Sequence, residues 1–173
     1  MTTIPVEFSR VASLELLTKR VDLLAMKATP AECEALAKRF HIVSIDFFEA
    51  EVSVKWRGGK SINYDVTGRL KARLTQSCIV TLQDIVENID DTFDFRVVHP
   101  KQMEELTEEL DEFQDIEFSE DDNVDLGEIA AQYLALSMDP YPRLKETAEL
   151  SILTPSTPKK NPFAALASLK KDK

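Results

Sequence analysis

The sequence predicts an α+β fold: a mainly antiparallel sheet with a long hairpin, packed by two helices and followed by a flexible C-terminal tail. Alternating apolar and polar residues run through two stretches joined by a Gly-Gly pair, which is typical of a half-buried hairpin. Capping signals at Thr29 and Asp125 each precede a helical pattern. With 173 residues, 43% of them hydrophobic, the chain can bury one core. We expect a single domain over 1–153 and a linker with a short helix over 154–173.

The amino-terminal part is expected to hold two short strands and a helix. Val6 and Phe8 alternate with polar neighbours, and Val21, Leu23 and Ala25 repeat the pattern. The run 29–32 (Thr-Pro-Ala-Glu) is a capping box with proline at the first helical position. A helix is therefore predicted from residue 30 to about residue 40.

The long hairpin is predicted over 50–74. A two-residue loop at 58–59 would place Trp56 opposite Ser61. A three-residue loop at 58–60 instead pairs Trp56 with Ile62 and Val54 with Tyr64, which puts the apolar side chains on one face, so this register is preferred. Trp56 and Tyr64 are then expected in the core. The opposite face carries a basic stripe, defined as Lys55, Arg57, Arg69, Lys71 and Arg73.

The second half of the domain is predicted to complete the sheet and add a second helix. Strands over 78–82 and 93–97 extend the sheet, with Phe93 and Phe95 pointing inward. Residues 100–123 are acidic and form a loop or a short helix. Asp125 and Glu128 form a second capping box, and the helix that follows ends before Pro140.

Charge is unevenly distributed along the chain. The net charge is −10, but residues 84–128 contain 18 acidic and 2 basic residues, so the remainder is mildly basic. Such polarity serves solubility, or it creates a split surface whose acidic side repels nucleic acid or attracts a basic protein. No apolar run approaches the length of a membrane span, and nothing at the amino end resembles a signal peptide. A cytoplasmic protein is expected.

The sequence contains no recognisable catalytic motif. It has no glycine-rich phosphate loop, no nucleophile elbow, and no histidine next to a plausible nucleophile. The two cysteines, Cys33 and Cys78, are too few for a cysteine zinc site, and the two histidines have no ligand spacing. Cys78 is most simply a small buried residue. We expect a protein that is not an enzyme and takes no metal, cofactor or small-molecule substrate.

The C-terminal segment 161–170, NPFAALASLK, has the pattern of a short amphipathic helix. Asn161 can cap it, Pro162 suits its first position, and a breaker-rich linker precedes it. A tethered helix this short is marginal alone, so a partner could supply its apolar contacts; the alternative is a frayed end that folds back on its domain. The predicted docking residues are Asn161, Pro162, Phe163, Leu166, Leu169 and Lys170.

Three segments together resemble one family, the YceD-type proteins named for large ribosomal RNA subunit accumulation. Segment 76–85, QSCIVTLQDI, is similar to the family's cysteine-containing strand; segment 125–129, DLGEI, is similar to the start of its helix. The tail NPFAALASLK looks like the ending of many bacterial members. Many members also carry a Cys-x-x-Cys pair and further cysteines, which suggest a metal site. Only Cys78 remains here, so no metal is carried over.

The resemblance implies a non-catalytic role in large-subunit biogenesis, supporting the synthesis, processing or stability of large-subunit (23S) rRNA. In one hypothesis the basic stripe lies against the phosphates of an rRNA precursor and the tail docks into a groove; a merely solvated face is the plain alternative for the stripe. In the other, the protein is an adaptor that binds a basic ribosomal or processing protein through the acidic segment 104–122, without touching RNA.

Overall fold

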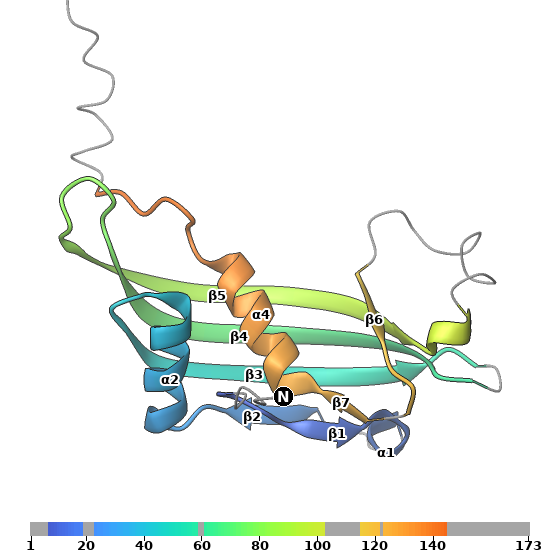
Figure 1. Cartoon of the computed structure of the whole chain (residues 1–173). Coiled ribbons are helices and arrows are strands. Elements are labelled where there is room, and N and C mark those ends of the chain that lie inside the picture. Colours follow the sequence, from blue (N-terminus) through green and yellow to red (C-terminus); the bar gives the residue numbers. More distant parts are fainter. Residues whose placement is uncertain (1–6, 19–22, 59–60, 103–114, 122, 145–173) are drawn as a thin grey trace, which may run out of the picture. The chain divides into compact units, whose positions relative to one another are not determined.

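The computed structural model describes residues 7–18, 23–58, 61–102, 115–121 and 123–144. A five-stranded sheet dominates it, in the order β2-β3-β4-β5-β6 (Figure 1). The strands are β2 (Leu24–Lys27), β3 (Ser44–Trp56), β4 (Asn63–Ser77), β5 (Asp84–Val98) and β6 (Ile116–Phe118). All neighbours are antiparallel except β5 and β6. The predicted α+β class with a mainly antiparallel sheet and a long hairpin is confirmed.

The β3–β4 hairpin has a different register from the predicted one. Trp56 pairs with Tyr64 and Val54 with Val66, so the register is shifted by two residues from the three-residue-loop alignment. The connection is longer, and its end is closed by the Arg57 N–H, which donates to the Asn63 carbonyl at 3.0 Å. A shift of two residues leaves every side chain on its predicted face, which is why the apolar pattern could not distinguish the registers.

Three further predictions about the strands are wrong. Trp56 is 52% exposed, although Tyr64 is buried as expected; alternation assigns a side chain to a face but does not say how far that face is covered. Residues 78–83 form a loop and not a strand, because Leu82 turns the chain back. Phe8 lies in a turn and not in a strand, whereas the strand expected around Leu23 and Ala25 is present as β2, in which Met26 is the buried residue.

The β4–β5 loop, residues 78–83, is closed by two backbone hydrogen bonds. The Cys78 carbonyl accepts from the Leu82 N–H at 2.9 Å, and the Cys78 N–H donates to the Gln83 carbonyl at 2.8 Å. Leu82 has φ of 59°, in the left-handed region that L-residues other than Asn and Asp rarely adopt. The Cys78 side chain is buried, as expected.

Helix α2 (Pro30–Phe40) begins as predicted. Thr29 caps it, and the capping box is complete because Glu32 accepts from the Thr29 N–H at 2.7 Å. The Glu32 carboxylate also accepts hydrogen bonds from the two terminal guanidinium nitrogens of Arg10, at 2.8 and 3.0 Å. The arginine bond, with the help of Thr29, lowers the pKa of Glu32 to about 2. The cap therefore joins α2 to the amino-terminal segment.

Helix α4 (Leu126–Ser137) also begins at its predicted cap. The Asp125 side chain accepts from the Glu128 N–H, but Glu128 does not complete the capping box. The Glu128 carboxylate instead accepts hydrogen bonds from both terminal nitrogens of Arg39 in α2, at 2.6 and 2.8 Å. The Arg39 bond lowers the pKa of Glu128. This ion pair ties the two helices that cover the sheet.

A small second sheet connects the amino-terminal segment to α4. Strand β1 (Val11–Ser13) pairs antiparallel with β7 (Asn123–Asp125), and the short helix α1 (Leu14–Thr18) follows β1. Neither α1 nor this pairing was predicted. Gly127 permits the contact, because a Cβ there would collide with the Phe8 carbonyl and the Arg10 backbone nitrogen.

The core lies between the helices and one face of the sheet. Phe93 and Phe95 point inward as predicted, and the Phe93 ring stacks on Tyr133 of α4 with centroids 4.7 Å apart. Gly68 of β4 lies directly across from Phe93, and a side chain at residue 68 would overlap with this ring. A short 3₁₀ turn (Pro100–Gln102) follows β5. Most of the predicted acidic stretch 100–123, and the predicted boundary at residue 153, lie outside the described residues.

We expect Glu32→Gln to destabilise the fold in a pH-dependent way. The folded-state pKa of about 2 lies below the ordinary value of 4.5, so the carboxylate stabilises the fold above that value and loses this effect as pH falls toward 2. Urea denaturation at pH 7 should show a loss of about 1 to 2 kcal/mol, which shrinks on acidification. Glu34→Gln, on the exposed face of α2, is the control and should change little. A loss that is equal at pH 7 and pH 3 would contradict this assignment.

Leu82→Gly is expected to stabilise the protein. Glycine adopts a positive φ without the clash that leucine has, and the gain exceeds the added entropy of the unfolded chain by about 0.5 to 1 kcal/mol. Thr81→Gly, one residue earlier and without a positive φ, should instead lower the free energy of unfolding. Thermal and urea unfolding of the three proteins test this pair, and the idea fails if both glycine variants are destabilised alike.

Candidate functional site

The predicted basic stripe lies on the sheet face opposite α2 and α4, here called the outer face. Lys55, Arg69, Lys71 and Arg73 project from β3 and β4 on this face and are exposed. Arg57 follows the last residue of β3 and lies in the hairpin connection. The strand alternation therefore gathers four of the five predicted cations on one surface.

The arginines of the stripe are paired with carboxylates of the same face. Arg69 donates from Nε and Nη2 to the two oxygens of Asp90, at 2.6 and 2.7 Å. Arg57 lies 2.8 Å from Asp65, and Arg73 lies 3.2 Å from Asp46. The Arg69 bond lowers the pKa of Asp90. Each of these guanidinium groups therefore has a negative partner in the protein itself.

The strand register also places acidic residues beside the lysines. Lys71 lies between Glu49 of β3 and Asp90 of β5 in the ladder, and Lys55 is directly opposite Asp65. Cross-strand neighbours of opposite charge attract and offset one another. The outer face consequently has mixed charge, and the sequence spacing of the cations alone did not reveal it.

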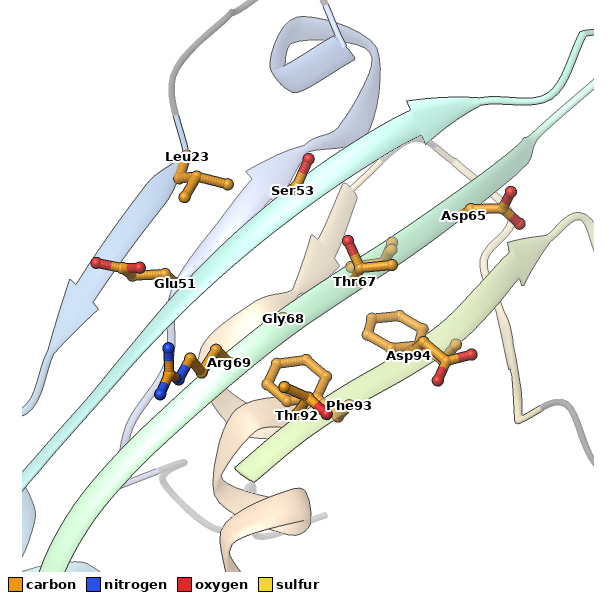
Figure 2. A pocket seen from close by; sticks show the side chains of 12 residues that line it. Leu23, Glu51, Ser53, Asp65, Thr67, Gly68, Arg69, Thr92, Phe93 and Asp94 are labelled. Carbon is orange, nitrogen blue, oxygen red and sulfur yellow. The ribbon is translucent and has the colours of Figure 1, made fainter. Parts of the chain in front are cut away.

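An open hollow of about 640 Å³ lies on this face, over the parts of β3, β4 and β5 that are nearer the β3–β4 connection. Figure 2 shows Glu51, Thr67, Arg69 and Asp94 projecting around it. Arg69 is the one cation among its described lining residues, and it is bound to Asp90. Besides Arg69, the polar side chains that line this outer hollow are three carboxylates and three hydroxyls, from Glu51, Asp65, Asp94, Ser53, Thr67 and Thr92.

These groups favour a cationic ligand over a phosphate. Carboxylate oxygens accept hydrogen bonds, and at neutral pH they attract ammonium or guanidinium groups and repel phosphate oxygens. The sequence carried a signal for them, because strand parity places Glu51 and Ser53 on the same face as Lys55. Asp94 and Thr92 of β5 are brought beside Thr67 and Arg69 of β4 only by the β4–β5 register.

The predicted docking residues of the tail, from Asn161 to Lys170, lie outside the described residues. In the part of the chain that the structure describes, no three His, Cys, Asp or Glu side chains are grouped to hold a metal ion. Cys33 and Cys78 are both buried, and neither forms a disulfide in the described residues. No helix among the described residues is long and apolar enough to cross a membrane.

We expect removal of the carboxylate partners to turn the outer face into a nucleic-acid-binding surface. The double variant Asp46→Asn/Asp90→Asn frees Arg73 and Arg69, so its affinity for single-stranded RNA should exceed that of wild type and fall more steeply with salt, by about one to two in the log–log slope. Fluorescence anisotropy over a salt series measures this.

The matched control for this RNA measurement is Asp84→Asn/Glu120→Gln. It makes the same change in net charge at exposed carboxylates that do not pair with the stripe in the described ion pairs. Equal RNA affinities for the two double variants would show that net charge, and not the local pairing, controls binding.

The comparison with protein families gives one match. The family model described as "Large ribosomal RNA subunit accumulation protein YceD" matches residues 66–170, more than half of the chain. The matched range contains most of β4, all of β5 and α4, and the outer-hollow residues of these two strands except Asp65. No curated protein and no solved structure matches the chain. The resemblance of segments 76–85, 125–129 and 161–170 is thereby confirmed, and the chain belongs to the YceD family of large ribosomal RNA subunit accumulation proteins.

Proposed function

We propose that this protein is a non-catalytic, cytoplasmic factor in biogenesis of the large ribosomal subunit, and that it acts as an adaptor for a basic ribosomal or rRNA-processing protein. The family name supports the link to large-subunit rRNA. In this proposal the protein promotes rRNA accumulation through its protein partner, without contacting RNA itself.

The observation that carries the adaptor role is the chemistry of the outer hollow. Its carboxylates and hydroxyls suit a lysine or arginine side chain of a partner, and Arg69 is already bound to Asp90. On β5 the exposed Asp90 and Asp94 lie on this same face, whereas Asp91 is on the helix side and accepts from the Ser137 hydroxyl. A partner with a basic surface would be drawn to this side of the sheet by charge complementarity.

Direct RNA binding by the basic stripe is the second candidate. Four exposed cations do share the outer face, and Lys55 and Lys71 have flexible side chains that can reach phosphates. The arginine–carboxylate pairs oppose this role, because phosphate contacts would have to replace the existing bonds while several carboxylates stay nearby.

A complementation experiment separates the two candidates. Cells that lack the protein receive wild type, the hollow variant Glu51→Gln/Asp94→Asn, or the lysine variant Lys55→Gln/Lys71→Gln. The ratio of large- to small-subunit rRNA is measured in each strain. Both variants change two exposed side chains to neutral isosteric or shorter amides, so each serves as the control for the other.

For the adaptor, the lysine variant should restore the rRNA ratio and the hollow variant should leave it low. The reverse result would favour direct RNA binding. If the ratio does not fall when the protein is absent, the proposed role in large-subunit biogenesis is wrong.

A further inference from the structure

An exposed apolar surface lies at the end of the sheet where β4 turns into β5. Leu82 has 77% of its surface exposed, and Ile79, Val80 and Tyr141 are 46 to 69% exposed. The Ile79 N–H donates to the Pro142 carbonyl at 3.0 Å, which brings Tyr141, the preceding residue, to the loop. We call these four residues the apolar tip.

Leu82 combines an exposed side chain with an unfavourable backbone conformation. Leucine in the left-handed region is strained, and Gly or Asn would adopt the same φ more easily. Because the Leu82 side chain is exposed, burial in the core does not compensate for this backbone strain. Backbone strain of this kind is common at binding sites, and here the strained conformation holds the Leu82 side chain where a partner can contact it.

Two acidic residues lie beside the tip. Asp84 follows the loop directly as the first residue of β5 and pairs with Ser77. Asp139 is adjacent as well, because its backbone carbonyl accepts from the Gln76 side chain at 3.2 Å. An apolar centre with a polar, charged rim is the general anatomy of a protein-binding surface.

We propose that the apolar tip is a docking site for a basic protein segment, and that Leu82 is its anchor. The partner would place an apolar side chain against Leu82 and Tyr141 and direct lysine or arginine side chains to Asp84 and Asp139. A second copy of this chain fits less well, because its net charge of −10 gives two copies like-charged surfaces. This proposal rests on the adaptor function and adds a contact surface that is separate from the outer hollow.

The experiment uses the full-length protein and, as probe, the total protein extracted from purified large ribosomal subunits. Binding is compared for wild type, Leu82→Asn and Leu136→Asn. Leu136, in α4, is also 77% exposed, so the control removes the same side chain at the same exposure from a different element. Asparagine tolerates a positive φ, so Leu82→Asn keeps the loop conformation, and thermal unfolding checks that both variants are folded.

The expected result is a loss of affinity of at least tenfold for Leu82→Asn and less than twofold for Leu136→Asn. A photo-crosslinking residue at position 82 should then crosslink to the basic large-subunit protein that wild type binds. The proposal is overturned if Leu82→Asn binds like wild type, if both variants weaken equally, or if position 82 crosslinks to a second copy or to RNA.

The outcomes also separate this proposal from the adaptor function. If Glu51→Gln/Asp94→Asn abolishes binding and Leu82→Asn does not, the adaptor function stands and the tip is not its docking site. If no large-subunit protein binds to wild type, the docking proposal for the tip is wrong, and the adaptor function is then decided by the rRNA ratio in the complementation experiment.

Discussion

Strand β4 is the constraint on which the rest of the structure depends. It is hydrogen-bonded to β3 on one side and to β5 on the other, and its fifteen residues all pair with β5. Because alternate residues of a strand point to opposite faces, this one element determines which side chains enter the core and which reach the outer face. Tyr64, Val66 and Leu70 face the helices for the same reason that Thr67, Arg69 and Lys71 face the solvent.

The mixed charge of the outer face follows from that ladder. A cation on β4 has two lateral neighbours, and on this sheet several of these neighbours are carboxylates. Exposed pairs of this kind add little to stability, commonly less than about 1 kcal/mol each. Their larger effect is on the electric field of the face, because an arginine that is bound to Asp90 presents a much weaker positive potential to a passing phosphate.

Much of the fold could be predicted from local patterns, and the errors have identifiable causes. The caps at Thr29 and Asp125 and the inward faces of β3, β4 and β5 were correct because each depends on residues close in sequence. The hairpin register was wrong because a shift of two residues preserves every face. Arg39 and Glu128 are 89 positions apart, and the paired residues of β1 and β7 are more than a hundred positions apart. No local pattern encodes either contact. For the carboxylates of the outer hollow, strand parity indicates the face of each residue, but their proximity to one another depends on three strands together.

The link between β1 and β7 has a consequence for the order in which the chain can fold during synthesis. Strands β2 to β5 follow one another along the chain, so their antiparallel pairs can form as soon as each strand leaves the ribosome. Ser9 and Arg10, in contrast, have their partner in Asp125, which is synthesised more than a hundred residues later. The amino-terminal segment is made first and can be secured only after α4 begins to emerge, so this junction closes late in the folding of the sheet-and-helix unit.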